Sequence, residues 1–398
     1  MKEGWKTVKL GEVCEKITDG SHNPPKGIEH SNYFMLSSQN VQDGYLLMDS
    51  VRYLSKEDFE LENKRTKAQK GDILLTIVGT IGRTCVLTGN EGNITFQRSV
   101  ALMKPIKAIN SYYLMYYFLY QNKDLNLKAN GAAQKGIYLK QLIQYPVILP
   151  PLEEQHRIVS ILDASFEKID ALKKNAEENL KNAKALFQQV LAQELEPKEG
   201  WVEKKLGEVC NKIVDGTHHS PTNTPEGEYP YITAKNIKHN GIDLSNITYV
   251  TRDIHREIYS RCNPEKGDVL MIKDGATTGI AVVNDLDFEF SLLSSVALLK
   301  TKMEILDSYY LCYVLNSPDV YNQFRSKMDG AAITRITLVK IKDAVIQVPP
   351  LDQQRKIVRT LDTLSEKCRR LEQVAQQTIC ECDALKQSIL RQAFSGEL

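Results

Sequence analysis

One kind of segment occurs twice in this chain, and it constrains the fold more than any other feature. The first copy begins at position 150 with PPLEEQ and continues with helical apolar spacing to about Leu191. The second begins at 349 with PPLDQQ, 199 positions later, and continues to about Leu390 without insertion. A proline pair followed by carboxylates favours the first turn of a helix. Each copy therefore predicts one long helix.

Apolar residues in both predicted helices alternate steps of three and four, which is a coiled-coil a/d seam sustained over about four heptads. A seam this narrow is half of an interface, and its matching half lies in the same chain. We therefore expect the two helices to pair with each other. The larger seam residues are predicted to be Leu162, Ile169, Leu172, Leu186, Leu361, Leu364, Leu371 and Leu385.

The sequence outside the helices is duplicated as well. The stretch at 4–20 returns at 200–216 with 12 of 17 positions identical, and KGDIL at 70–74 returns as KGDVL at 266–270. A repeat of about half the chain is too long for a solenoid and indicates duplication of a whole unit, a lobe plus a helix. The predicted domains are lobe 1 at 1–150, a helix at 151–196, lobe 2 at 197–349 and a helix at 350–398.

Each lobe should combine strands and helices. Apolar or alternating runs predict strands near 33–41, 72–78, 95–103 and 145–149. The run Tyr112–Tyr120 has helical length, and its tyrosines share one face, which favours a core or an interface over base stacking. Stretches rich in Gly, Pro, Asn, Ser and His at 18–27 and 214–227 predict exposed loops at the same point of both lobes.

Composition narrows the possible functions. The longest apolar stretch is too short to span a bilayer, no apolar run follows the N-terminal residues, and the eight cysteines lack CxxC spacing. We therefore expect a cytoplasmic protein without a membrane partner. The formal net charge is only +1, with +5 over residues 1–151 and −2 over 200–349. DNA binding would thus require cations gathered on one surface or supplied by another subunit.

No motif indicates catalysis. The stretch NPPK at 23–26 lacks the aromatic fourth residue that amino-methyltransferases use to hold the target base, and no glycine-rich cofactor loop follows a strand. There is no phosphate-binding loop, and His218 and His219 lack further ligands at metal spacing. We expect no catalytic residue, no metal site and no cofactor in this chain.

Several motifs together resemble the specificity subunit of type I restriction-modification enzymes. They are DGSH at 19–22 with DGTH at 215–218, the two KGD motifs, the GAA segments that precede PPLEEQHRIV and PPLDQQRKIV, and LKQSILRQAFSGEL at the C-terminus. The likeness covers essentially the whole chain. Two departures are Ser21 in place of Thr and the absence of the Phe-Ser-Gly ending from the first helix.

The resemblance implies an α+β fold with two similar target recognition domains. They would be separated by two long antiparallel helices that form an intramolecular coiled coil with pseudo-twofold symmetry. It also implies a non-catalytic subunit that binds double-stranded DNA, each lobe reading one half of an asymmetric bipartite site with an unread spacer. Two methyltransferase subunits carrying S-adenosylmethionine would dock on the helices, and restriction subunits using ATP and Mg would join them.

Candidate base contacts are polar residues that we expect to be exposed in loops near the glycine turns. In the first lobe they are Gln39, Asn40, Arg83, Gln134 and Lys135, and in the second His218, Lys235, Asn236, Lys273, Thr334 and Arg335. Two alternatives remain open. One is a DNA methyltransferase that acts alone, and the other is a coiled-coil assembly scaffold without DNA preference.

Overall fold

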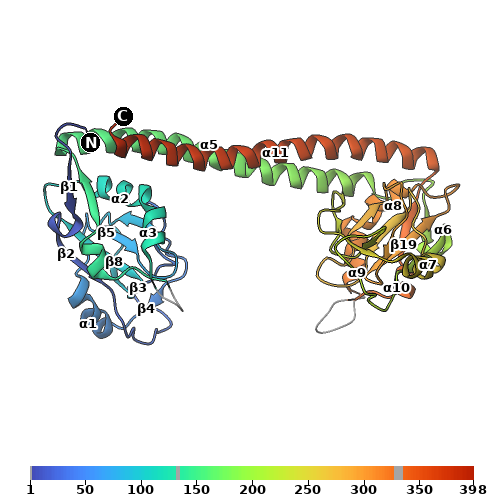
Figure 1. Cartoon of the computed structure of the whole chain (residues 1–398), viewed down its shortest axis with the longest axis horizontal. Helices are drawn as coiled ribbons and strands as arrows, with labels where there is room; N and C mark the ends of the chain where they lie inside the picture. The colour runs from blue at the N-terminus through green and yellow to red at the C-terminus, as the bar shows by residue number, and fades with distance from the viewer. Residues whose placement is uncertain (1, 131–134, 327–334) are drawn as a thin grey trace. The chain divides into compact units, whose positions relative to one another are not determined.

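The computed structural model describes residues 2–130, 135–326 and 335–398, and the chain forms two compact units (Figure 1). Unit 1 comprises Met1–Glu177 and Gln376–Leu398, and unit 2 comprises Glu178–Ala375. Both long helices begin directly after their proline pairs, as predicted: α5 spans Leu152–Glu194 and α11 spans Leu351–Ser395. Each unit therefore contains one lobe and a part of both helices.

Lobe 1, the part of unit 1 outside these helices, contains two main sheets. One is antiparallel in the order β2-β8-β5-β6, and the other has the order β4-β3-β7 with β3 and β7 parallel. A separate pair, β1 with β9, leads into α5. The elements are β1 (Lys6–Lys9), a 3-10 turn (Leu10–Glu12), β2 (Cys14–Asp19), β3 (Tyr33–Leu36), β4 (Arg52–Tyr53), α1 (Lys56–Thr66), β5 (Ile73–Thr76), β6 (Thr84–Val86), β7 (Asn93–Phe96), β8 (Val100–Pro105), α2 (Ser111–Tyr120), α3 (Asn122–Lys128), α4 (Leu139–Ile143) and β9 (Pro146–Leu149).

Lobe 2 repeats this topology. Its sheets have the orders β11-β19-β16-β17 and β15-β12-β18, with β12 and β18 parallel, and β10 pairs with β20 before α11. A short hairpin, β13 with β14, is added. The elements are β10 (Val202–Lys205), α6 (Leu206–Val209), β11 (Cys210–Asp215), β12 (Tyr229–Ile232), β13 (Ile237–Lys238), β14 (Gly241–Ile242), β15 (Thr248–Val250), α7 (Arg252–Arg261), β16 (Val269–Ile272), β17 (Ala281–Val283), β18 (Ser291–Leu292), β19 (Val296–Thr301), α8 (Ser308–Leu315), α9 (Pro318–Ser326), α10 (Leu338–Lys342) and β20 (Val345–Val348).

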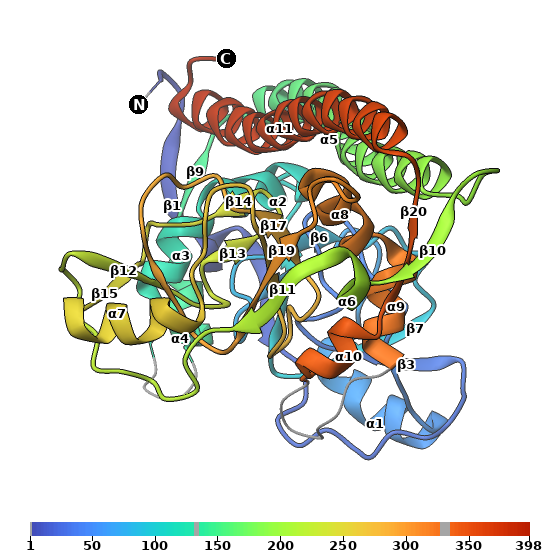
Figure 2. The same ribbon diagram turned by 90° about the vertical axis from the view of Figure 1, so that its right-hand side faces the viewer.

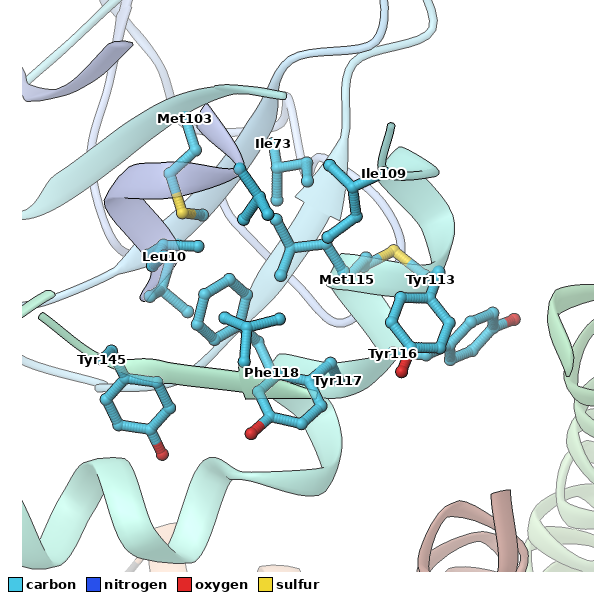
Figure 3. Packing of buried hydrophobic residues seen from close by; sticks show 14 of the residues in the cluster. Leu10, Ile73, Met103, Ile109, Tyr113, Met115, Tyr116, Tyr117, Phe118 and Tyr145 are labelled. Carbon is cyan, nitrogen blue, oxygen red and sulfur yellow. The ribbon is translucent and has the colours of Figure 1, made fainter. Parts of the chain in front are cut away.

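The aromatic helix α2 supplies much of the core of lobe 1, as predicted (Figure 3), although Tyr112 of its tyrosine face is 42% exposed. Tyr113 and Tyr117 are almost completely buried, and their hydroxyls donate to Ile148 O and Pro146 O, each at 2.9 Å. Burial raises the pKa of Tyr117 to about 12, so its hydroxyl stays a hydrogen-bond donor at neutral pH. These bonds attach the helix to β9, the strand that leads into α5.

A buried glutamine anchors the first turn of each long helix to the lobe of the same unit. The Gln155 side chain donates to Ala108 O (3.1 Å) and Pro150 O (2.9 Å) and accepts from the Asn110 backbone N–H (2.8 Å). The Gln354 side chain makes the same three bonds in unit 2. Its partners are Ile305 O (2.8 Å), Pro349 O (2.7 Å) and the Asp307 N–H (2.8 Å).

The helices pair antiparallel within each unit, as predicted (Figures 1 and 2). In unit 1, Lys173 binds Asp383 at 2.7 Å, and Asp170, one turn earlier, binds Lys386, so residue numbers rise in one helix as they fall in the other. In unit 2, Leu191 near the end of α5 shares a core cluster with Ile357 and Leu361 near the start of α11.

Half of the predicted seam is wrong. Leu162, Ile169 and Leu361 are buried, and Leu364 is half-buried. The predicted seam residues Leu172, Leu186, Leu371 and Leu385 are instead 52%, 44%, 55% and 49% exposed. The repeating position that starts each heptad is correct. The second seam position lies four residues after it and not three, at Phe166, Lys173, Leu180 and Phe187 of α5 and at Ser365, Glu372, Ile379 and Lys386 of α11.

The physical reason is the size of the residues that start each heptad. Ala176, Ala183, Cys368, Ala375 and Cys382 are small and buried, so each helix presents a narrow strip to its neighbour. Leu186, Leu371 and Leu385 each lie three residues beyond one of these small residues and therefore fall outside that strip. On the other flank the Lys386 ammonium lies over the Phe166 ring, with Nζ 4.8 Å from the ring centroid.

Candidate nucleic-acid interface

In each lobe, five chain segments meet at one surface, which we call the turn surface. They are the turns after four strands (β2, β3, β5 and β7 in lobe 1) and the segment before a short helix (α4 in lobe 1). In lobe 1 the segments are 20–22, 37–40, 77–80, 97–99 and 135–137, and in lobe 2 they are 216–218, 233–236, 273–276, 293–295 and 335–336.

Hydrogen bonds made by backbone N–H groups join four of these segments in lobe 1 through the turn after β7. The Arg98 N–H donates to Ser21 O at 2.8 Å, and the Ile77 N–H donates to Ser99 O at 2.9 Å. The Ser38 N–H donates to Ser99 Oγ at 3.1 Å. Lobe 2 repeats all three bonds, in which Ser294, Lys273 and Ala234 donate to Thr217 O, Ser295 O and Ser295 Oγ at 2.9, 2.9 and 3.1 Å. The surface is therefore a fixed platform in both lobes.

The duplicated Asp-Gly motif fits this platform because the glycine has no side chain. A Cβ at Gly20 would lie 2.0 Å from Phe96 O, and one at Gly216 would lie 1.9 Å from Leu292 O. No side chain can occupy that space. The glycine lets the turn pass directly against the parallel strand, and the residues on either side of it are thereby placed at the surface.

Asp19, which directly precedes the first segment of the turn surface of lobe 1, holds a histidine and an arginine. Its side chain is only 9% exposed, and its two oxygens bind different partners, His22 Nε2 at 2.8 Å on Oδ2 and Arg65 Nη2 on Oδ1. The His22 and Arg65 side chains are 54% and 49% exposed. One buried carboxylate thus holds an imidazole and a guanidinium side by side, and both remain open to solvent.

Asp215 holds the equivalent histidine and arginine in lobe 2, but both lie nearest the same oxygen. Its side chain is 4% exposed, with His218 Nε2 at 3.2 Å and Arg261 Nη2 at 3.7 Å from Oδ1. Arg261 also donates to the backbone oxygens of Asp215, at 3.1 Å, and Gly216. His218 and Arg261 are 59% and 54% exposed.

Lobe 2 extends this cluster with charges that lobe 1 lacks. Lys273 Nζ lies 3.4 Å from Asp215 Oδ2 and 3.6 Å from Asp274 Oδ1, and Arg335 Nε donates to Asp274 Oδ1 at 2.9 Å. The backbone bridge between Asp274 and Arg335 corresponds to the bridge between Val78 and Gly136 in lobe 1. The three charged positions are therefore Ile77, Val78 and Gly136 in lobe 1.

The predicted base-contacting residues are distributed unevenly. His218, Lys273 and Arg335 belong to one connected cluster, which the sequence had not joined. Gln39, Lys135 and Lys235 are exposed on the turn surfaces, and Arg83 is half-buried after the turn that follows β5. Gln134 and Thr334 lie outside the described residues. Whether any of these side chains contacts a base stays a prediction.

The expected exposure is wrong for Asn40, Asn236 and Lys273, which are 3%, 6% and 4% exposed. Asn40 Oδ1 accepts from the Ser37 N–H at 2.9 Å, and Asn236 Oδ1 accepts from the Thr233 N–H at 3.0 Å. Each asparagine is thus consumed in shaping its own turn. Lys273 is buried because two carboxylates neutralise its ammonium.

Sequence reasoning missed His22, Arg65 and Arg261. His22 belongs to the duplicated DGSH motif, but only its partner His218 was chosen. The two arginines lie at the C-terminal ends of α1 and α7, far in sequence from the motif, inside stretches that otherwise diverge. The available signal was that the same residue type recurs 196 positions later within a divergent region.

The duplicated Lys-Gly-Asp motif supports the fold behind this surface. Burial raises the pKa of Asp72, and the nearby Lys104 ammonium, with Nζ 2.5 Å from Oδ2, opposes the rise. Burial likewise raises the pKa of Asp268, and Lys300 opposes it at 2.7 Å. Each aspartate also accepts a backbone N–H from three residues earlier. The motif therefore closes the turn before the central strands β5 and β16.

Within residues 2–130, 135–326 and 335–398, no three His, Cys, Asp or Glu side chains are grouped as a metal site would need. The helices of that same part of the chain include none with the length and hydrophobicity required to cross a membrane.

The family model described as "Type I restriction modification DNA specificity domain" matches the chain twice, at residues 2–182 and 198–380. The chain is 22% identical to the EcoKI specificity subunit of Escherichia coli K12, over all of this chain and 90% of that protein. It is 20% identical to the putative MjaX specificity subunit of Methanocaldococcus jannaschii, of which it covers 94%. A 29% match to the Escherichia coli EcoBI specificity subunit spans 48% of this chain and 41% of that protein.

Solved structures have the same fold. A chain from a study of complex assembly and conformational transition of the type I R-M system aligns over 100% of this chain, with a TM-score of 0.77 and 21% identity. The HsdS subunit from Thermoanaerobacter tengcongensis aligns over 100% of this chain, with a TM-score of 0.58 and 21% identity.

Proposed function

The chain belongs to the type I restriction modification DNA specificity domain family, and on that premise we propose that it is the DNA-reading subunit of such a complex. Each lobe would read one half of an asymmetric bipartite site through its turn surface. The observation that supports this most directly is the duplication of one rigid platform that carries different exposed side chains in the two lobes. A shared scaffold with divergent polar contacts suits two unlike half-sites.

The unread spacer of the site would follow from the long helices. A helix of 43 residues, such as α5, is about 65 Å long, which is comparable to two turns of DNA at roughly 34–36 Å each. Inserting a few residues near 194–197 should change the length of the gap and leave both half-site sequences unchanged. Methylome sequencing that finds the same gap in such a variant would contradict this part of the proposal.

We assign no catalysis to this chain, and its partners would supply it. Two methyltransferase subunits would carry S-adenosylmethionine, and restriction subunits would use ATP and Mg. The isolated chain should therefore not bind S-adenosylmethionine in calorimetry. Stoichiometric binding would contradict the assignment and favour a methyltransferase that acts alone.

The exposed leucines of the helices are suitable docking residues for the methyltransferase subunits. Leu172 and Leu371 occupy equivalent positions 199 residues apart, and so do Leu186 and Leu385, yet all four are about half exposed. Each unit carries one pair of them, Leu172 with Leu385 in unit 1 and Leu186 with Leu371 in unit 2. Two equivalent apolar pairs match two copies of one partner.

The decisive experiment is selection from random duplexes by the full chain together with the methyltransferase subunit. We expect two short conserved sequences separated by a fixed unread gap. Exchanging residues 1–150 for the lobe of a relative should change one of the two sequences and leave the other intact. Selection that returns no preferred sequence would favour an assembly scaffold without DNA specificity.

A further inference from the structure

The two turn surfaces can be divided into what they share and what distinguishes them. The exposed residues that they share are the histidine and the arginine held by the buried aspartate, His22 with Arg65 and His218 with Arg261. Among the positions that differ, written as lobe 1 and lobe 2, are Gln39 and Lys235, Ile77 and Lys273, Val78 and Asp274, Arg98 and Ser294, and Gly136 and Arg335.

A DNA partner likewise has one part that is constant and one part that varies with sequence. Every half-site offers the same phosphate backbone, whereas the base edges differ between half-sites. A residue pair that is present in both lobes, within otherwise different sequence, suits the phosphate backbone because the backbone is the same in every half-site. The differing residues that are exposed, such as Gln39, Lys235 and Arg335, suit the bases.

We propose that the His–Arg pair held by each buried aspartate is a phosphate clamp, one in each lobe, that binds the DNA backbone without regard to sequence. This inference rests on the proposed function. It assigns Arg65 and Arg261, which the sequence did not indicate, to phosphate contact, and it assigns Arg335 of lobe 2 to base contact.

The geometry of the clamp suits a phosphate group, whose negative charge is spread over several oxygens. Asp19 and Asp215 are buried, so the aspartate is shielded from an approaching phosphate, while the arginine guanidinium and the histidine imidazole that it holds face solvent. In lobe 2 the buried Lys273 places an additional positive charge against Asp215. In each lobe the exposed guanidinium therefore presents N–H donors and a positive charge outward, with the imidazole beside it, as phosphate binding requires.

Arg65 and Arg261 also bind loop atoms, so a purely structural role must be distinguished from DNA contact. The test is the dependence of DNA affinity on salt, which a structural role would not change. A phosphate contact adds about 1 to the slope of log K against log salt concentration, and its removal weakens all sequences alike. A base contact instead alters the preferred sequence at one position.

The variants are Arg65→Ala and Arg261→Ala, assayed as the full chain with the methyltransferase subunit. The duplexes are the selected site and a scrambled one. We expect each variant to lower the slope by about 1, to weaken both duplexes by the same factor, and to return the wild-type sequence in selection. Arg335→Gly, which introduces the lobe 1 residue, should change one half-site only.

Matched controls are available on the same two helices. Lys56 and Arg252 are equivalent first residues of α1 and α7, 63% and 55% exposed, at the ends opposite Arg65 and Arg261. Lys56→Ala and Arg252→Ala should leave the slope unchanged. If an alanine variant does not fold, the Arg→Gln variant removes the charge and retains a donor for the loop, and the same slope change is expected.

Two results would overturn the clamp. One is an unchanged slope in variants that fold and bind, which would leave the arginines with a structural role. The other is an altered consensus sequence in Arg65→Ala or Arg261→Ala, which would make them base readers. Failure of the wild-type complex to prefer any duplex would instead refute the proposed function itself, so the two failures are distinguishable.

Discussion

The two buried glutamines at the helix entries permit a quantitative prediction. Gln155 and Gln354 are completely buried, and each side-chain amide bonds three backbone groups of its own unit. Truncation to alanine leaves two carbonyls and one N–H without their partner. A hydrogen bond contributes about 1 kcal/mol net, so Gln155→Ala and Gln354→Ala should each destabilise by about 3 kcal/mol.

Differential scanning calorimetry and urea unfolding would measure this loss. For a unit of about 200 residues, 3 kcal/mol corresponds to a fall in Tm of roughly 6–12 °C. Gln155→Glu should be worse at neutral pH, because a carboxylate has no donor for Ala108 O and Pro150 O.

The matched controls are Gln387→Ala and Gln373→Ala, which remove exposed glutamines of α11 in unit 1 and unit 2. They should change stability by less than about 0.5 kcal/mol. If the buried and exposed variants lost the same small amount, the reasoning from three orphaned backbone groups would be refuted, because water would then be replacing the amide without penalty.

Three further predictions concern unit 1 and the thiols. Leu172→Ala should change the free energy of unfolding by less than about 0.5 kcal/mol, whereas Ile169→Ala should lower it by about 2–4 kcal/mol in urea unfolding. A larger loss for Leu172→Ala than for Ile169→Ala would instead place Leu172 in the seam, as the sequence predicted. The Arg157 guanidinium lowers the pKa of Glu154 to about 2, against roughly 4.3 when unfolded. The stabilisation from Glu154 should thus be present above about pH 4.3 and be lost as the pH falls toward 2, so the stability difference between wild type and Glu154→Gln should vanish there; a constant difference would contradict it. The exposed Cys380 should be the thiol that a disulfide reagent labels rapidly in the folded chain, since six of the other seven cysteines are buried and Cys312 is half-buried; Cys380→Ser should then abolish rapid labelling, and fast labelling that persisted would contradict the buried positions.

The sequence was sufficient to predict the architecture because whole structural elements are duplicated in it. Two proline pairs, each followed by the same helical spacing of apolar residues, predicted where both long helices begin. The repeated motifs predicted two lobes of one kind. The repeated Asp-Gly motifs also predicted loops at the same point of both lobes, and these loops lie at one edge of the turn surfaces. These features depend on local sequence signals, such as proline pairs and Asp-Gly turns. One copy of each signal is enough for the prediction, and the second copy supports it.

The candidate site was less predictable because exposure depends on neighbours that are distant in sequence. Asn40 and Lys273 have the chemistry of base-reading residues, but one shapes its own turn and the other neutralises two aspartates. Arg65 lies 46 residues from the aspartate that it binds. Only the fold brings these groups together, so composition and spacing could not separate structural polar residues from available ones.

The seam shows a further limit, and it arises from geometry. At about 100° per residue, positions three and four residues beyond a contact lie roughly 60° to one side and 40° to the other. Apolarity alone chose the first of these, because Leu172, Leu186, Leu371 and Leu385 occupy it. The helices use the second, where Lys386 covers Phe166. A hydrophobic pattern records every apolar surface that a helix must bury, including any contributed by another protein. Leucines that lie outside the intramolecular seam at equivalent positions of both helices are therefore better explained by a partner than by the folding of this chain.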